Sequence, residues 1–300
     1  MRGWLYLIPL VVAAQGQPTF RADATLVTVP VLVTTPAGAP VLDLQASDFR
    51  VYDNSAPSEI RQVWFEEQLP LVIGIIVDVS DSQRSFLREH RAAVSAFLAR
   101  VLHPGDRAFV VAVNEKVNIE EEYIGRPTGP SQVLLPPKGR PLGQPCGTLR
   151  GRSLCGGTAL WNAVYASAHD KLNRYEGSKA LLILSDGDDT GSTHSLDQAV
   201  EEVQRAGAMV YAIRYPDPVS QISGEGLARL ADETGGAEFS PPAGDYEALA
   251  IFGRVERDLR SHYILGIPPS EAADPVHRLR VEVKRPGLTV RARRQYVAPE

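Results

Sequence analysis

Three side chains with hard oxygen atoms follow one apolar run, and their types suit a metal ion. Asp78, Ser80 and Ser82 lie at alternate positions directly after residues 71–77. That run is hydrophobic at odd and even positions alike, which is typical of a strand buried on both faces of a parallel sheet. Ligands bind at the carboxyl ends of such strands, and Mg²⁺ prefers oxygen ligands. The sequence therefore predicts a metal site where this strand ends.

Two further segments supply oxygen atoms in comparable places. The apolar run 180–185 ends at a second carboxylate, Asp186. Thr158 follows two glycines and opens a segment with helical spacing of apolar residues. Each segment is a weak signal alone. Their chain order, and their shared position at a strand end or a helix start, make the set specific.

This set resembles the metal-ion-dependent adhesion site of von Willebrand factor type A domains. The family pattern is Asp-x-Ser-x-Ser, then a Thr, then an Asp, and it falls on Asp78, Ser80, Ser82, Thr158 and Asp186. The resemblance implies that the three hydroxyls bind the metal directly. It also implies that the two aspartates bind directly or through water.

The resemblance spans roughly residues 68–260 and has one departure at the site. The family often has Gly before the last serine of its motif, whereas this chain has Asp81, whose charge bears on metal preference. Residues 29–34 and 48–53 resemble a secreted bacterial subfamily first described in Acidobacteria. In that subfamily a β-rich segment precedes the A domain.

The implied function is adhesion through a metal bridge. A cation held mainly by neutral hydroxyls keeps much of its charge and can bind an exposed Asp or Glu of a protein partner. Mg²⁺ is the expected ion, with Mn²⁺ or Ca²⁺ as alternatives. Two other interpretations stay open, namely a metal that is purely structural and a hydrolase or phosphatase that uses Asp78 as nucleophile. Without a metal, Asp78 and Asp186 would cap helices, and the two serines would bond to local backbone.

Most enzyme classes lack support in the sequence. No Gly-x-Ser-x-Gly elbow, Walker loop or His-Glu-x-x-His motif occurs, and Ser80 stands where the aspartyl phosphatase pattern has a second Asp. The chain is therefore interpreted as a binding protein rather than an enzyme. Residues 186–197 also partly fit a calcium loop of the EF-hand kind, but a strand rather than a helix is predicted before them. Asp188 and Asp189 are interpreted as a solvated turn or as added charge beside the site.

The N-terminus and the two cysteines indicate export. Residues 1–16 combine a short charged start, an apolar stretch and small residues, as in a secretory signal. A buried strand or a short membrane anchor is the alternative. In an oxidising compartment Cys146 and Cys155 are expected to form a disulfide, the alternative being two free thiols. The expected location is the periplasm, the cell envelope or the exterior.

Composition and periodicity predict a globular α/β protein. The 300 residues are 44% hydrophobic and 22% charged, and the net charge of −5 argues against a nucleic-acid partner. Strands alternate with helices over 68–260, so we expect a Rossmann-like, doubly wound, mostly parallel sheet.

The ends of the chain are expected to form a second, smaller module. We expect residues 17–67 to form a β segment that pairs with strands in 261–300 as a small β-sandwich. The basic side chains of those C-terminal strands are interpreted as their solvated face. Between the two sheet strands of the site, residues 125–157 form a long Gly- and Pro-rich loop, which is expected to shape specificity.

Overall fold

The structure is a computed structural model, and it describes part of the 300-residue chain. The described residues are 26–65, 69–126, 148–149, 152–153, 157–215, 224–241, 248–270 and 276–297. The predicted signal segment, Cys146, Cys155 and most of the loop 125–157 lie outside them. Among the described residues no helix is long and apolar enough to cross a membrane.

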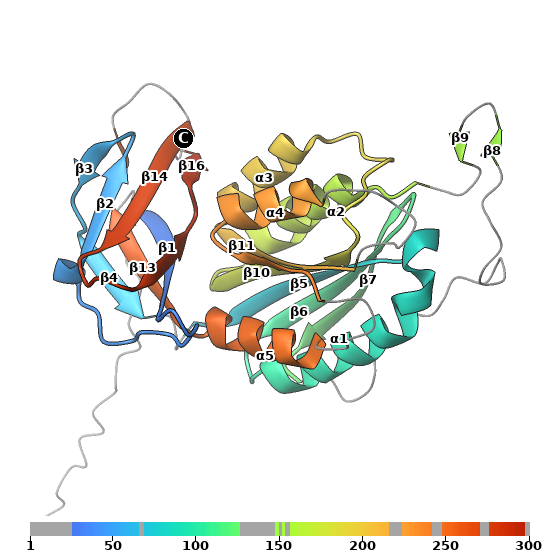
Figure 1. Ribbon diagram of the computed structural model, residues 1–300, viewed down its shortest axis with the longest axis horizontal. Helices are drawn as coiled ribbons and strands as arrows, with labels where there is room; N and C mark the ends of the chain where they lie inside the picture. Colours follow the sequence, from blue (N-terminus) through green and yellow to red (C-terminus); the bar gives the residue numbers. More distant parts are fainter. Residues whose placement is uncertain are drawn as a thin grey trace, which may run out of the picture.

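A six-stranded sheet forms the centre of the larger part of the molecule (Figure 1). Its neighbouring strands are parallel except at one edge, where the last strand runs antiparallel. In spatial order the strands are β12 (Ala237–Phe239), β11 (Ala208–Arg214), β10 (Ser178–Ser185), β5 (Leu71–Asp78), β6 (Arg107–Val113) and β7 (Val117–Ile124). A separate pair of short strands, β8 (Thr148–Leu149) and β9 (Arg152–Ser153), precedes the first helix of one face.

Helices cover both faces of this sheet. Figure 1 shows α1 and α5 below it and α2, α3 and α4 above it, and each layer closes its own hydrophobic core. The helices are α1 (Leu87–Val101), α2 (Leu160–Ala166), α3 (Leu196–Arg205), α4 (Glu225–Glu233) and α5 (Ala248–Leu259). This arrangement confirms the predicted doubly wound, mostly parallel α/β fold.

Burial of the central strand β5 on both faces explains why its sequence lacks alternation. All eight of its residues are buried, because helices cover both faces. Gly74 is required within it, since a Cβ atom there would lie 2.5 Å from Cζ of Phe109 on β6. The strand that ends at Asp78 is therefore closely packed against its neighbour β6.

The two ends of the chain form a β-sandwich, as predicted. We call it the terminal sandwich, and its two four-stranded sheets enclose a core that includes Val29, Val31 and Leu265 from one sheet and Phe49 and Tyr296 from the other. One sheet consists of β15 (Thr289–Ala292), β1 (Val27–Thr34), β13 (His262–Ile267) and β4 (Gln62–Phe65). The other consists of β16 (Gln295–Val297), β14 (Val276–Val283), β2 (Phe49–Asp53) and β3 (Ala56–Ser58).

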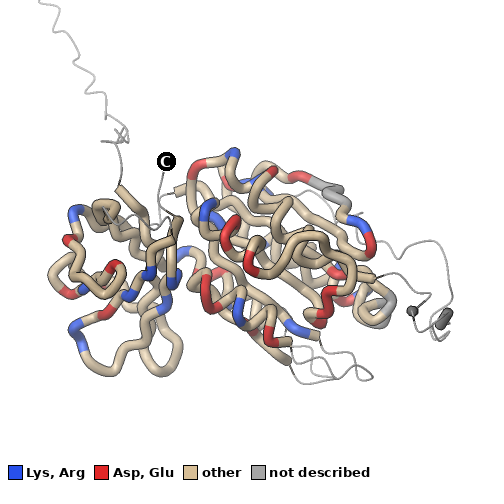
Figure 2. Tube along the Cα trace, turned by 90° about the horizontal axis from the view of Figure 1, so that it is seen from above, with Lys and Arg blue, Asp and Glu red and all other residues tan. Residues whose placement is uncertain are grey.

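Arginines of the last strands hold the terminal sandwich against the helices. Figure 2 shows basic residues gathered on the sandwich where it adjoins the rest of the chain. The Arg291 guanidinium pairs with the buried Asp258 of α5. Arg293, itself buried, donates to the carbonyl of Gln204 on α3 at 3.1 Å. Arg294 pairs with Asp232 of α4 at 2.7 Å. The interpretation of these arginines as a solvated face was therefore wrong for Arg291 and Arg293.

Removal of the Arg291 charge should strongly destabilise the protein. Asp258 is only 2% exposed, so Arg291→Met would leave a buried carboxylate without its partner. A loss of about 3–5 kcal/mol in unfolding free energy is expected for such a broken pair. Chemical denaturation would measure it, with Arg285→Met as the control, because Arg285 pairs with Asp43 in water and should matter little. Equal stabilities for the two variants would contradict the role given to Arg291.

Candidate metal centre

The ends of β5 and β10 bring two aspartates to one edge of the sheet. The strands are parallel neighbours with Val77 opposite Leu184, so Asp78 lies beside Ser185 and Asp186. Asp78 has no exposed surface. Its Oδ2 accepts a hydrogen bond from the Ser185 hydroxyl at 2.7 Å, and its Oδ1 accepts one from the backbone N–H of Ser80 at 2.9 Å. Strand register thus fixes the position of this carboxylate.

Burial makes the charge of Asp78 costly. Desolvation raises the pKa of this carboxyl to about 6, and nearby Asp186 adds to the rise, whereas the hydrogen bonds from Ser80 and Ser185 act in the opposite direction. The ionised form is therefore under-stabilised by its surroundings. A cation close to this edge would stabilise it.

A chain of hydroxyls links the serines of the motif to the second aspartate. The Ser82 hydroxyl donates to Oδ2 of Asp186 at 2.7 Å, and the Ser80 and Ser82 hydroxyl oxygens are 3.0 Å apart. Between the Ser80 and Ser82 hydroxyls either one can be the donor, and the Ser80 side chain also forms a hydrogen bond to Asp78. Four of the five predicted site residues thus form one hydrogen-bonded cluster.

The fifth residue, Thr158, reaches the same edge by a different route. Its backbone N–H donates to Oγ1 of Thr190 at 3.1 Å, and its carbonyl accepts from the N–H groups of Thr190 and Gly191 at 3.0 and 2.9 Å. These bonds attach the start of α2 to the loop that follows Asp186. In the described part of the chain, no hydrogen bond joins the Thr158 hydroxyl to the other four residues.

Gln83 is a site residue that sequence reasoning missed. Its side chain is fully buried, and its Nε2 donates to Oδ2 of Asp186 at 3.1 Å and to the carbonyl of Tyr215, after β11, at 3.0 Å. Asp186 is thereby held from the 3₁₀ helix Asp81–Phe86 that follows the motif. Ser185 was also missed, although alternation along a strand that ends at Asp186 could have suggested it. No sequence signal distinguishes Gln83.

The loop after Asp186 is anchored on α2, and its surroundings do not match a calcium loop of the EF-hand kind. Oδ1 of Asp189 accepts from the backbone N–H of Trp161 at 3.2 Å and from the Ser192 hydroxyl at 2.5 Å. A strand precedes the loop, and the Asp197 carboxylate pairs with Arg229 at 2.5 Å. Asp189 therefore holds the helix start, and is not simply part of a solvated turn.

The donor set and its charge fit a hard cation. Burial, Asp186 and Asp189 raise the pKa of Asp188, which indicates mutual repulsion among these carboxylates. Within the described ranges no Lys or Arg forms an ion pair with Asp78, Asp186, Asp188 or Asp189. No group of three or more His, Cys, Asp or Glu there is arranged as metal ligands. The oxygen donors at this edge include the Ser80 and Ser82 hydroxyls as well as the carboxylates.

Comparisons with known proteins give matches of fold. No family model matches the chain, and neither does any curated protein. Solved structures similar to it include a von Willebrand factor type A protein from Catenulispora acidiphila, at 13% identity and a TM-score of 0.43, covering 93% of this chain and 75% of that one. They also include mussel byssus proximal thread matrix protein 1 with a zinc-occupied MIDAS motif, at 15% identity and a TM-score of 0.45, covering 70% of this chain and 50% of that one.

Another similar structure is the human COPII-coat protein Sec24c, at 9% identity and a TM-score of 0.43. The match covers 78% of this chain but only 44% of Sec24c, so this chain spans less than half of that protein. Von Willebrand factor type A proteins are thus among the structures this fold resembles, as predicted. The strand order and the helices on both faces place the fold in that α/β class.

Replacing Gln83 should destabilise the protein. Gln83→Leu would remove one donor from Asp186 and leave the Tyr215 carbonyl without this bond. The loss of these two buried hydrogen bonds, one of them to a carboxylate, is expected to cost about 1–3 kcal/mol. Urea denaturation would measure the loss, with the exposed Gln62 of β4 changed to Leu as the matched control. That control should shift stability by no more than about 0.5 kcal/mol. Indistinguishable variants would show that Gln83 has no such role.

A histidine below the site should contribute a pH dependence. His90 of α1 is buried between the rings of Phe86 and Tyr215, and burial lowers its pKa to about 4. In the unfolded chain its pKa lies near 6.5, so the unfolded state gains a proton first on acidification. His90 therefore costs no stability above pH ~6.5 and about 2 kcal/mol by pH ~5.

Comparison with His90→Phe isolates that contribution, because Asp78 acts with the opposite sign. The raised pKa of Asp78 favours folding as the pH falls below about 6. The difference in unfolding free energy between parent and variant should therefore shift by about 2 kcal/mol between pH ~7 and pH ~5, to the disadvantage of the parent. Denaturation at the two pH values would test this. A constant difference would refute the effect.

Proposed function

We propose that this chain is a metal-dependent protein-binding module of the adhesion type. The observation that carries the proposal is the cluster of Asp78, Ser80, Ser82 and Asp186, in which oxygen atoms converge and negative charge has no basic partner among the described residues. Mg²⁺ is the ion we propose, with Mn²⁺ or Ca²⁺ as alternatives. The function is binding and not catalysis.

The hydrogen bonds favour hydroxyls as direct ligands and water as the link to Asp186. A serine that donates its proton to a carboxylate still presents oxygen lone pairs to a cation. Ser82 is in that state, and the Ser80 hydroxyl is hydrogen-bonded to it. Oδ2 of Asp186 already accepts from Ser82 and Gln83, and its Oδ1 accepts from the N–H of Asp188 at 3.0 Å. We assign Thr158 as the third hydroxyl ligand on the resemblance alone.

Such a ligand set leaves charge on the ion for a partner. Neutral hydroxyls and water do not cancel the charge of a divalent cation, and Mg²⁺ exchanges water for carboxylate oxygen in protein sites. An exposed Asp or Glu of a partner protein would then complete the coordination. The ion is thus the recognition element, and the surrounding loops set which partner fits.

Burial of Asp78 disfavours the phosphatase alternative. A nucleophile must reach its substrate, yet this carboxylate has no exposed surface and both oxygens already accept hydrogen bonds. A purely structural metal is the other alternative, and it predicts that chelation lowers stability and leaves partner binding unaffected.

The cellular setting in this proposal rests on sequence. We propose that residues 1–16 direct export to the periplasm, the envelope or the exterior, and that residues 17–67 and 261–300 flank an A domain over 68–260. A disulfide between Cys146 and Cys155 would stabilise the loop 125–157 that shapes specificity.

Calorimetric titration of Mg²⁺ and Mn²⁺ into the metal-stripped protein tests the site. Saturable binding of one ion per chain is expected, and Asp78→Ala should weaken it at least ~10-fold, since about 1.4 kcal/mol corresponds to that factor. Asp170→Ala, which removes an exposed carboxylate on another part of the chain, should leave binding unchanged. Saturable binding that survives in Asp78→Ala would place the ion elsewhere.

The same variants, assayed with a generic phosphoester, distinguish a binding function from catalysis. The parent with Mg²⁺ should hydrolyse p-nitrophenyl phosphate no faster than buffer. Turnover that Asp78→Ala abolishes and Asp170→Ala retains would instead support the phosphatase alternative. The absence of metal binding and of turnover would overturn both.

A further inference from the structure

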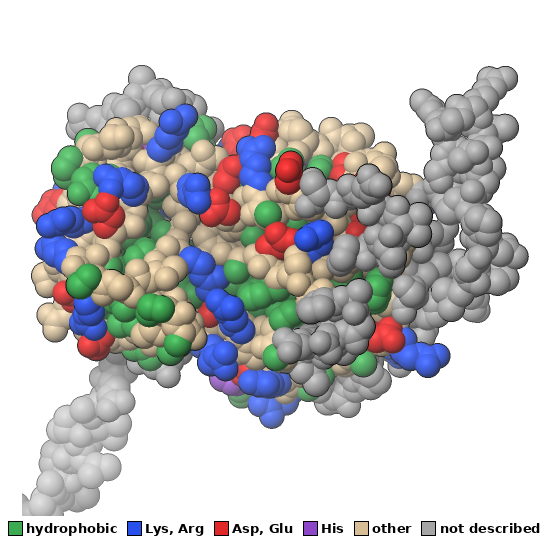
Figure 3. All heavy atoms as spheres, viewed as in Figure 1, with side chains coloured by type: hydrophobic (Ala, Val, Ile, Leu, Met, Phe, Trp, Pro, Cys, Tyr) green, Lys and Arg blue, Asp and Glu red, His purple; other side chains and the backbone are tan. Residues whose placement is uncertain are grey.

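A cavity lies between the terminal sandwich and the amino ends of the central strands. Its volume is about 510 Å³, which is within the range of small-molecule sites. The space-filling view shows hydrophobic side chains on the sandwich and on its neighbour, with basic groups at the junction between them (Figure 3). Leu69 precedes β5, and Ser178 and Lys179 begin β10, so the cavity lies at the end of the sheet opposite Asp78 and Asp186.

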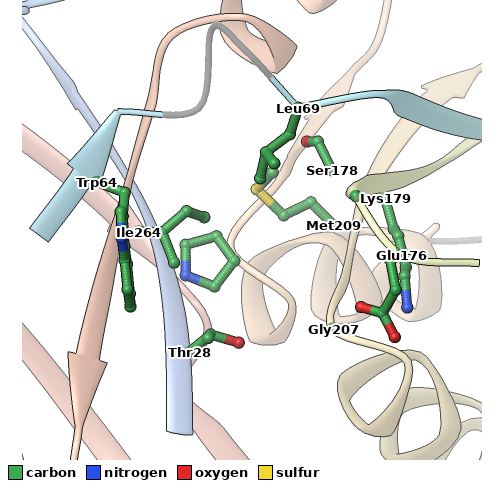
Figure 4. A pocket seen from close by; sticks show the side chains of 11 residues that line it. Thr28, Trp64, Leu69, Glu176, Ser178, Lys179, Gly207, Met209 and Ile264 are labelled. Carbon is green, nitrogen blue, oxygen red and sulfur yellow. The ribbon is translucent and has the colours of Figure 1, made fainter. Parts of the chain in front are cut away.

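Two apolar walls face each other across this cavity. Trp64, Ile264 and Pro30 line it from the sandwich, and Leu69 and Met209 line it from the central sheet (Figure 4). Met209 and Ile264 are buried, and the other three are partly buried. The walls come from segments far apart in sequence, so the cavity depends on how the sandwich is held against the central sheet, and the arginines described above contribute to that.

One side of the cavity carries unpaired polar groups. Lys179 is partly buried there, and desolvation lowers its pKa. Its ammonium forms no hydrogen bond or ion pair within the described residues, and the nearby Glu176 is exposed at the rim. The residue Ser178 is only 4% exposed, and its hydroxyl also has no hydrogen-bond partner in the described part of the chain. A partly buried cation and a buried hydroxyl without hydrogen-bond partners are costly, so this wall favours an anionic ligand.

We propose that this cavity binds an amphipathic monocarboxylate, such as a medium-chain fatty acid, with its apolar body between the two walls and its carboxylate at Lys179. Charge complementarity selects the anion, because the single ammonium would gain the partner it lacks. A dianion such as a phosphate monoester fits less well, since the one ammonium can compensate only one negative charge of the ligand and the nearby Glu176 already adds another. This site is separate from the proposed metal centre.

Calorimetric titration of decanoate, with decanol as its uncharged match, tests the proposal on the whole chain. The parent should bind decanoate saturably below about 1 mM. Lys179→Met retains the apolar stem and removes the charge, so it should weaken decanoate at least ten-fold while changing decanol binding less than two-fold. Lys116→Met removes an exposed lysine on the turn between β6 and β7 and should change neither. Equal decanoate affinity in parent and Lys179→Met would overturn the proposal.

A second variant tests the position of the ligand. Thr28 is exposed on β1 and lines the cavity, so Thr28→Trp adds bulk there without a large change in the core. It should abolish binding of decanoate and decanol while leaving the unfolding temperature and Mg²⁺ titration as in the parent. Unchanged decanoate binding in Thr28→Trp, or no saturable binding by the parent, would refute the assignment whatever the outcome at Asp78.

Discussion

The buried carboxylate of Asp78 is the constraint on which the site depends. A charge removed from water needs compensating partners, or it becomes neutral. The partners here are the Ser185 hydroxyl and the Ser80 N–H, and both are present because β5 and β10 pair in one register. A shift of one residue in that pairing would remove Ser185 from Asp78. The register of the most buried strands in the protein therefore determines the electrostatics at their carboxyl ends.

Buried polar side chains connect elements on two sides of the central sheet. At the carboxyl ends of the strands, Gln83 joins Asp186 to the backbone that follows β11. On the side of the terminal sandwich, Arg291 and Arg293 join the sandwich to α5 and α3. Gly235, where φ is +83°, shows how close that junction is, since a Cβ there would lie 2.7 Å from the backbone of Ala292 and Arg293. The sandwich is thus attached through buried polar contacts to the helices that cover the sheet.

Periodicity predicted the fold well because burial leaves a direct record in sequence. Apolar runs at 71–77 and 180–185 became β5 and β10, and the alternating C-terminal segments became sandwich strands. Strand β13 was not predicted, because only two residues separate it from the end of α5. Gln83 and Arg291 could not be predicted either, since their roles depend on partners over 100 residues and 33 residues away, respectively. The local metal-site motif could be predicted from the sequence, whereas polar pairing between distant residues could not.

The same pattern of hydrogen bonds bears on how metal and partner would act together. Burial raises the pKa of Asp78 to about 6, and Asp186 already accepts hydrogen bonds from Ser82, Gln83 and the N–H of Asp188. With hydroxyls and water as its nearest ligands, a divalent ion would therefore have few direct carboxylate ligands from this chain. If a partner's carboxylate supplies the remainder, it must raise the affinity for the ion by the same factor by which the ion raises the affinity for the partner. Weak metal binding by the isolated protein and strong metal binding in the complex are then two expressions of one coupling free energy.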